Sequence, residues 1–192
     1  MFKMTIACIF VSCFLSGWAS AASMCSSSIT KNLESCAKSN FELADQGLNK
    51  RYREVASRLS EGDRSLLVAA QREWVRHKER TCQEAYESAL PGQEAEIDRW
   101  TCLDQMTRTR TSELNYIDSG MGGDGFFRAV DIISRYYEHG DRNRFISKLV
   151  ADSTRDESRD WQEYVRDTCI LSARQTHEEE NTCIARQQFY RY

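Results

Sequence analysis

The fold follows from residues 72–82, which read REWVRHKERTC, because nearly the same pattern returns at 159–169 as RDWQEYVRDTC. In each copy a cysteine lies eight residues after a tryptophan. This spacing brings the two side chains close to one face of a helix after roughly two turns. Each copy is followed by a further cysteine that also comes after a threonine, Cys102 or Cys183. The chain therefore contains an internal repeat.

The first 21 residues have the features of a secretory signal peptide. Lys3 precedes an apolar run at 6–15, and residues 19–21 supply the small side chains that signal peptidase requires. The apolar run is shorter than the about 20 residues that span a bilayer, which disfavours a membrane anchor. A lipobox at 10–13 is also disfavoured, because apolar residues continue beyond it. We expect cleavage after Ala21, a periplasmic or secreted protein, and no membrane insertion of the mature chain.

Cleavage leaves six of the eight cysteines, in a compartment that permits disulfide bonds. The repeat favours bonds within each copy and predicts three pairs: Cys25 with Cys36, Cys82 with Cys102, and Cys169 with Cys183. An alternative bond joins Cys36 to Cys82, because a helical hairpin that turns near Gly62 would bring them together. A metal site is the other alternative, although no CxxC or HxxxH spacing supports it.

The charge of the mature chain excludes some classes of partner. Removing Lys3 with the signal peptide changes the formal net charge from −3 to −4, so the mature protein is mildly acidic. This composition fits neither nucleic-acid binding nor attraction to an anionic membrane surface. The sequence also contains no motif that indicates a cofactor.

A glycine-rich segment, SGMGGDG at 119–125, divides the mature chain. Four of the nine glycines lie in these seven residues, which is typical of a flexible connection. We therefore expect a first domain over 22–118 and a second, degenerate copy of its helical repeat over 126–192.

The periodicity of apolar residues predicts an all-α protein. In the first unit these residues recur at intervals of three and four along 41–59, 67–85 and 97–117, and Gly62 and Pro91 separate the segments. The second unit has four shorter segments of the same kind, at 127–137, 145–150, 161–168 and 183–190. No segment alternates as a strand would. We expect a small three-helix bundle held by disulfides, followed by a shorter helical unit.

Two motifs of the first unit occur together at fairly specific spacings. One is D-x2-L-N-x2-Y, formed by Asp45, Leu48, Asn49 and Tyr52, and the other is A-Q-R-x-W-x7-C, with Gln71, Arg72, Trp74 and Cys82. On these motifs, residues 25–117 resemble the N-terminal domain family of LprI-type lysozyme inhibitors. The resemblance implies a disulfide-bonded helical bundle in the bacterial cell envelope and, for the named member of the family, inhibition of lysozyme. The second unit lacks the first cysteine pair and the D-x2-L-N segment.

Most of the motif residues are predicted to be structural. Trp74 and Trp161 lie on apolar stripes, where an aromatic side chain is more often core than binding site. Asp45 and Asn49 are one helical turn apart, which favours a local hydrogen bond. Gln71 and Arg72 lie beside a core tryptophan, and we expect their long side chains to make structural contacts as well.

The candidate partner-binding residues are two acidic clusters, each enclosed by a predicted disulfide. They are Glu94, Glu96 and Asp98 in the first copy, and Glu178, Glu179 and Glu180 in the second. Lysozymes are typically cationic, so acidic loops would steer such a partner and accelerate association. The alternative is that both clusters begin a helix, where carboxylates are stabilised by the helix dipole.

No catalytic site is indicated. His77, on a charged helix face, His139 and His177 have no partner at a recognisable catalytic spacing. With the mature cysteines in disulfides, no thiol nucleophile remains. We therefore expect a binding protein that inhibits lysozyme or a related peptidoglycan hydrolase. The alternatives are an envelope interaction or immunity protein with another toxin or assembly partner, and a carbohydrate-processing enzyme.

Overall fold

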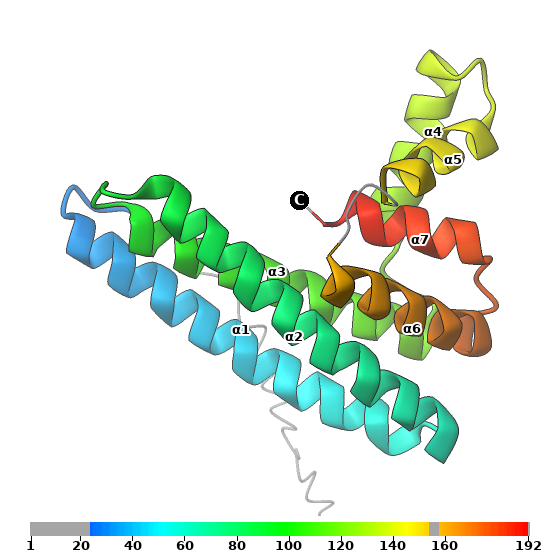
Figure 1. Ribbon diagram of the computed structural model, residues 1–192, viewed down its shortest axis with the longest axis horizontal. Helices are drawn as coiled ribbons and strands as arrows, with labels where there is room; N and C mark the ends of the chain where they lie inside the picture. The colour runs from blue at the N-terminus through cyan, green and yellow to red at the C-terminus, as the bar shows by residue number, and fades with distance from the viewer. Residues whose placement is uncertain (1–23, 154–157, 192) are drawn as a thin grey trace, which may run out of the picture.

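The computed structural model describes residues 24–153 and 158–191 (Figure 1). The predicted signal peptide, 1–21, lies outside the described residues. Within the described part the protein is all-α, as predicted, with no strand. The helices are α1 (Thr30–Arg58), α2 (Glu61–Ala89), α3 (Ala95–Ser119), α4 (Asp124–Tyr137), α5 (Arg142–Ser153), α6 (Arg159–Thr176) and α7 (Glu180–Phe189).

Helices α1, α2 and α3 form a bundle in which successive helices run antiparallel (Figure 1). The hydroxyl of Ser60 starts α2 by accepting a hydrogen bond from the backbone N–H of Asp63 (3.2 Å), which is an N-cap. Gly62 therefore lies in the first turn of α2 and not in the connection before it. Pro91 follows α2 and cannot continue a helix. Gly120, at φ 69°, ends α3 in a left-handed conformation that favours glycine.

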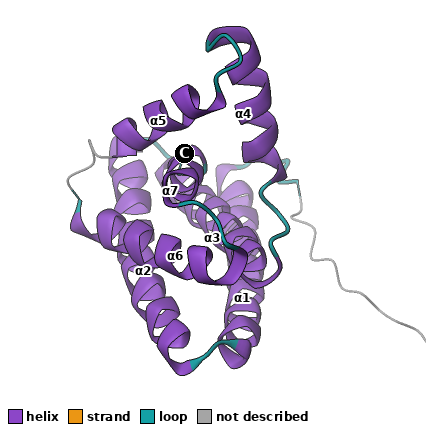
Figure 2. Ribbon diagram, turned by 90° about the vertical axis from the view of Figure 1, so that its right-hand side faces the viewer, coloured by secondary structure: helices purple, strands orange, loops and turns teal. Residues whose placement is uncertain are grey.

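Helix α6 packs antiparallel on α2, so the two tryptophan helices of the repeat lie against each other. Two ion pairs define this orientation. Arg80, late in α2, contacts Asp160 at the start of α6 (3.0 Å), and Arg174, late in α6, contacts Asp63 at the start of α2 (3.0 Å). Helix α7 lies between α6 and the α4–α5 hairpin (Figure 2).

One hydrophobic core extends through both copies of the repeat. Its buried residues include Leu67 and Trp74 of α2, Leu114 of α3, and Trp161 and Val165 of α6. A smaller cluster joins α4 to α7. Apolar burial of this kind contributes about 25 cal/mol per Å². The main core therefore continues across the glycine-rich segment at 119–125, at which the sequence predicted a domain boundary.

All three predicted disulfides are present, and the alternative bond between Cys36 and Cys82 is wrong. The Cα–Cα distances are 5.8 Å for Cys25–Cys36, 5.5 Å for Cys82–Cys102 and 5.6 Å for Cys169–Cys183. The last two bonds join α2 to α3 and α6 to α7, so each copy of the repeat links its tryptophan helix to the helix that follows. Among the described residues no helix is long and apolar enough to cross a membrane. No three His, Cys, Asp or Glu side chains of residues 24–153 and 158–191 are grouped to hold a metal ion.

Candidate functional site

The first acidic cluster lies at the turn that connects α2 to α3. Between residues 81 and 98 the sequence has five carboxylates and no Lys or Arg. Glu94 is the N-cap residue of α3, and Glu96 and Asp98 are in its first turn, where the helix dipole favours negative charge. Glu94 and Asp98 are exposed and Glu96 is half-buried. The cluster therefore starts a helix and also presents negative charge to solvent.

An exposed apolar residue accompanies these carboxylates. Leu90 precedes Pro91 in the turn and is 51% exposed. An apolar side chain surrounded by polar groups is a common composition for a protein contact. We call residues 90–98 the acidic tip.

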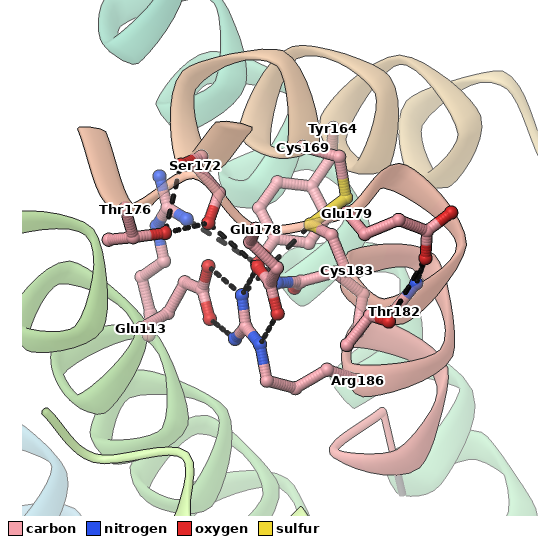
Figure 3. The surroundings of a disulfide bond; sticks show 12 residues. Glu113, Tyr164, Cys169, Ser172, Thr176, Glu178, Glu179, Thr182, Cys183 and Arg186 are labelled. Atoms are coloured by element: carbon pink, nitrogen blue, oxygen red, sulfur yellow. Dashed lines mark hydrogen bonds and ion pairs between the residues drawn. A yellow bond between two sulfur atoms is a disulfide. The ribbon is translucent and has the colours of Figure 1, made fainter. Parts of the chain in front are cut away.

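The three residues of the second acidic cluster lie in different environments; Figure 3 shows those of Glu178 and Glu179. Glu178 is buried and faces the protein interior. Glu179 caps α7 by accepting hydrogen bonds from the backbone N–H (2.9 Å) and hydroxyl (3.0 Å) of Thr182. The backbone hydrogen bond from Thr182 lowers the pKa of the Glu179 carboxyl. Glu180 is exposed. This cluster lies at the opposite end of the molecule from the acidic tip, so the fold does not bring the two clusters together (Figure 1).

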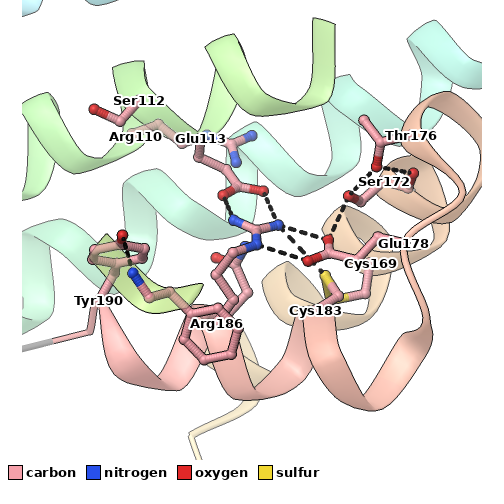
Figure 4. A network of polar contacts seen from close by, with 12 residues as sticks. Arg110, Ser112, Glu113, Cys169, Ser172, Thr176, Glu178, Cys183, Arg186 and Tyr190 are labelled. Carbon is pink, nitrogen blue, oxygen red and sulfur yellow. Dashed lines mark hydrogen bonds and ion pairs between the residues drawn. A yellow bond between two sulfur atoms is a disulfide. The ribbon is translucent and has the colours of Figure 1, made fainter. Parts of the chain in front are cut away.

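Glu178 belongs to a buried network centred on Arg186 (Figure 4). The guanidinium of Arg186 donates to Glu178 through Nε (2.9 Å) and Nη2 (2.8 Å), and to Glu113 through Nη1 and Nη2. Ser172 donates a further hydrogen bond to Glu178 (2.7 Å). Burial by itself lowers the pKa of Arg186, but attraction to Glu113 and hydrogen bonds to both carboxylates outweigh it and hold this pKa above its ordinary value.

The sequence did not point to Arg186 or Glu113. They are 73 residues apart, on α7 and α3, and neither belongs to a motif or to the repeat. Their network links the side chains of α7 and α3 next to the Cys169–Cys183 disulfide. We read it as structural, since all of its charged groups are satisfied internally.

Most of the motif residues contact neighbouring side chains or lie in the core. Asn49 donates to Asp45 (2.8 Å) along α1, and Gln71 accepts from Arg110 Nε (2.9 Å). Of the remaining motif residues, Leu48, Trp74 and Trp161 belong to the core. Tyr52 is half-buried and Arg72 is exposed.

His77, which the sequence placed on a charged helix face, is buried in the structure. It is 1% exposed, because α6 covers it, and its ring lies 4.8 Å from that of Trp161. Arg80 Nη2 lies 3.1 Å from His77 Nδ1. Since arginine can only donate, Nδ1 is the acceptor and the neutral ring carries its hydrogen on Nε2.

Replacing His77 with glutamine is expected to reduce the loss of stability in acid. Burial, with smaller contributions from Arg191 and Arg80 against an opposing one from Asp160, lowers the pKa of His77 to about 4 from 6.5. Below pH about 6.5, His77 is therefore protonated in the unfolded chain, whereas in the folded chain it stays neutral until the pH falls to about 4. The wild type should lose up to roughly 3 kcal/mol of unfolding free energy across this window through this group.

The measurement is the unfolding free energy of wild type and H77Q from about pH 7 to about pH 4. Other groups titrate in the same window, so the relevant quantity is the difference between the two proteins at each pH. The exposed His177 provides a matched control, because H177Q should follow the wild type. Parallel curves for wild type and H77Q would contradict the prediction.

The comparisons with known proteins agree with the resemblance seen in the sequence. The family described as "Lysozyme inhibitor LprI" matches residues 21–114. A relative, "Uncharacterized protein R02472" of Rhizobium meliloti (strain 1021), is 31% identical over 96 residues, covering 43% of this chain and 69% of the relative. No solved structure gave a significant match. The matched family region contains α1, α2, most of α3 and the acidic tip. This chain belongs to the lysozyme inhibitor LprI family.

Proposed function

We propose that this chain is a non-catalytic periplasmic or secreted protein that binds and inhibits lysozyme or a related peptidoglycan hydrolase. The observation that carries this proposal is its membership of the LprI family. Three disulfides in a chain of this size suit an oxidising compartment outside the cytoplasm.

The acidic tip is the surface that we propose for contact with the enzyme. Glu94 and Asp98 are exposed, Glu96 is half-buried, and the sequence between 81 and 98 has no Lys or Arg. A cationic enzyme would be drawn toward this end of the molecule, which raises the rate of association. Leu90 would then supply apolar area at the centre of the contact. In the second cluster only Glu180 offers an exposed carboxylate that does not cap a helix.

The primary test is inhibition of several lysozyme classes by oxidised residues 22–192, with lysis of peptidoglycan-containing cells and direct binding measured in parallel. Inhibition that saturates near one equivalent of protein supports the proposal. Binding without inhibition, or no binding to any class, contradicts it and favours an envelope or immunity protein with another partner. Turnover of peptidoglycan by this protein alone would contradict its non-catalytic character.

Neutralising the acidic tip with the triple variant E94Q, E96Q and D98N is expected to slow association with an inhibited lysozyme by about tenfold at low ionic strength. The difference from wild type should shrink as salt is added, because the attraction between exposed charges is screened. Association and dissociation rates measured over a series of salt concentrations provide the test.

A control of equal charge change removes carboxylates elsewhere. The variant E42Q, E61Q and D124N alters three exposed positions outside the acidic tip and should retain most of the association rate. A separate E180Q variant reports on the second cluster. The same association rate and salt slope for the tip variant and wild type would exclude the acidic tip as the steering surface.

A further inference from the structure

A cavity of about 590 Å³ lies between the two copies of the repeat. Its walls come from α2, α3, α6 and α7, and they include both repeat tryptophans, Trp74 and Trp161. Gln105, one of the lining residues, is exposed, so the cavity is open to solvent. This volume is in the range of cavities that hold small molecules. The cavity is separate from the acidic tip.

The charged residues that line the cavity are all basic. They are Arg108, Arg110 and Arg191, and no Asp or Glu is part of the lining. Arg108 has a carboxylate partner in Asp104 (2.9 Å). Arg191 lies over the ring of Trp161, 4.6 Å from its centroid.

Arg110 is the unusual member of this group. It is 1% exposed, and its hydrogen bonds go to two neutral groups, Gln71 (2.9 Å) and the Tyr164 hydroxyl (3.4 Å). It forms no ion pair with any residue in the described part of the chain, and its Nη2 has no hydrogen-bond partner there. Arg186, equally buried, has two carboxylates. Arg110 also lies over the ring of Tyr164, 5.1 Å from its centroid. A buried cation without a carboxylate partner is still costly, so the site favours an anion that pairs with it.

Two further residues of the lining, His77 and Gln187, each carry a buried donor nitrogen without a partner. His77 Nε2 carries the ring hydrogen, and Gln187 Nε2 is identified as the amide donor because Gln187 Oε1 accepts from the Tyr164 hydroxyl (2.8 Å). Both side chains are buried, at 1% and 6% exposure, and neither nitrogen has a partner among the described residues. The three unpartnered groups of the lining, on Arg110, His77 and Gln187, are thus all N–H donors. Buried donors of this kind require acceptors.

We propose that this cavity binds a small organic oxyanion, a carboxylate or a phosphate ester with an apolar body. The oxyanion pairs with Arg110 and accepts hydrogen bonds from His77 and Gln187, since a guanidinium presents several donors to such a group. The apolar body packs between Trp74 and Trp161. This site does not depend on the proposed inhibition of lysozyme.

The test uses benzoate, octanoate and phenyl phosphate as probes, with benzamide and octanol as neutral counterparts. Binding to oxidised residues 22–192 is measured by calorimetry and by tryptophan fluorescence. Binding of a carboxylate or of the phosphate ester, with much weaker binding of the neutral compounds, supports the site and identifies which oxyanion it takes. No binding of any anion at millimolar concentration, or equal binding of the neutral compounds, overturns it.

Variants locate the site within the cavity. R110Q is expected to weaken binding of the anionic probe by about tenfold or more, because it removes a charged hydrogen-bond donor. R108Q is the matched control, since that arginine already has Asp104, and should have a much smaller effect. T109W, at a half-buried lining position, should fill the cavity and abolish binding without removing any charge. Unchanged binding by R110Q and T109W would overturn the proposal. Lysozyme inhibition by the same variants is measured separately, so that failure of anion binding and failure of the proposed inhibition can be distinguished.

Discussion

Replacing Arg186 with methionine is expected to lower the free energy of unfolding by about 3–5 kcal/mol. The substitution would leave Glu113 and Glu178 buried, each without its guanidinium partner. Removing one member of a buried charge network costs this much because the remaining charges keep their desolvation penalty and lose their attraction. The loss would also remove the ion pairs that link α7 to α3.

Denaturant unfolding of oxidised residues 22–192, followed by circular dichroism, measures this loss. Arg174 is the matched control, because its ion pair with Asp63 lies on the surface and R174M should cost at most about 1 kcal/mol. A triple variant, R186M with E113L and E178M, should recover much of the stability, because an apolar cluster carries no buried charge. Equal stability of R186M and R174M would show that the network contributes little.

Replacing Trp161 with alanine is expected to cost about 3–5 kcal/mol, the usual range for deleting a large core aromatic side chain. Trp161 is 3% exposed and contacts the rings of His77 on α2 and Tyr164 on its own helix. Because the core is shared, the first three helices should become less stable together with α6. Hydrogen exchange in α1, together with the denaturation midpoint, measures this coupling.

The control for Trp161 is an aromatic residue outside the core. Tyr136 on α4 is 73% exposed, and Y136A should change stability by less than about 0.5 kcal/mol. If W161A left hydrogen exchange in α1 unchanged, the two units would be energetically independent, as two domains joined by a flexible segment would be. Faster exchange in α1 would instead show that the copies of the repeat fold as one cooperative unit.

Local patterns in the sequence predicted the helices and the disulfides. Intervals of three and four between apolar residues located the seven helices of the described residues, since that spacing defines a continuous apolar face. The repeat predicted that Cys82 would bond to Cys102 and Cys169 to Cys183, because each pair links consecutive helices. The acidic residues at 94–98 and 178–180 likewise flank helix starts, which is a short-range property.

Contacts between distant segments could not be predicted in this way. Periodicity shows which face of α2 is apolar but not that α6 covers His77 on the neighbouring face. Nor does it show that Arg186 meets Glu113, 73 residues earlier, or that Arg110 lacks a carboxylate.

The sequence by itself thus determined the helices, the disulfides and the family of this protein, because each is encoded in residues of one segment or in a repeated spacing. The tertiary structure alone decided which charges are exposed, which are buried and paired, and which line a cavity. Burial and pairing depend on which helix faces which, and packing between distant helices sets this relation, which local spacing does not encode.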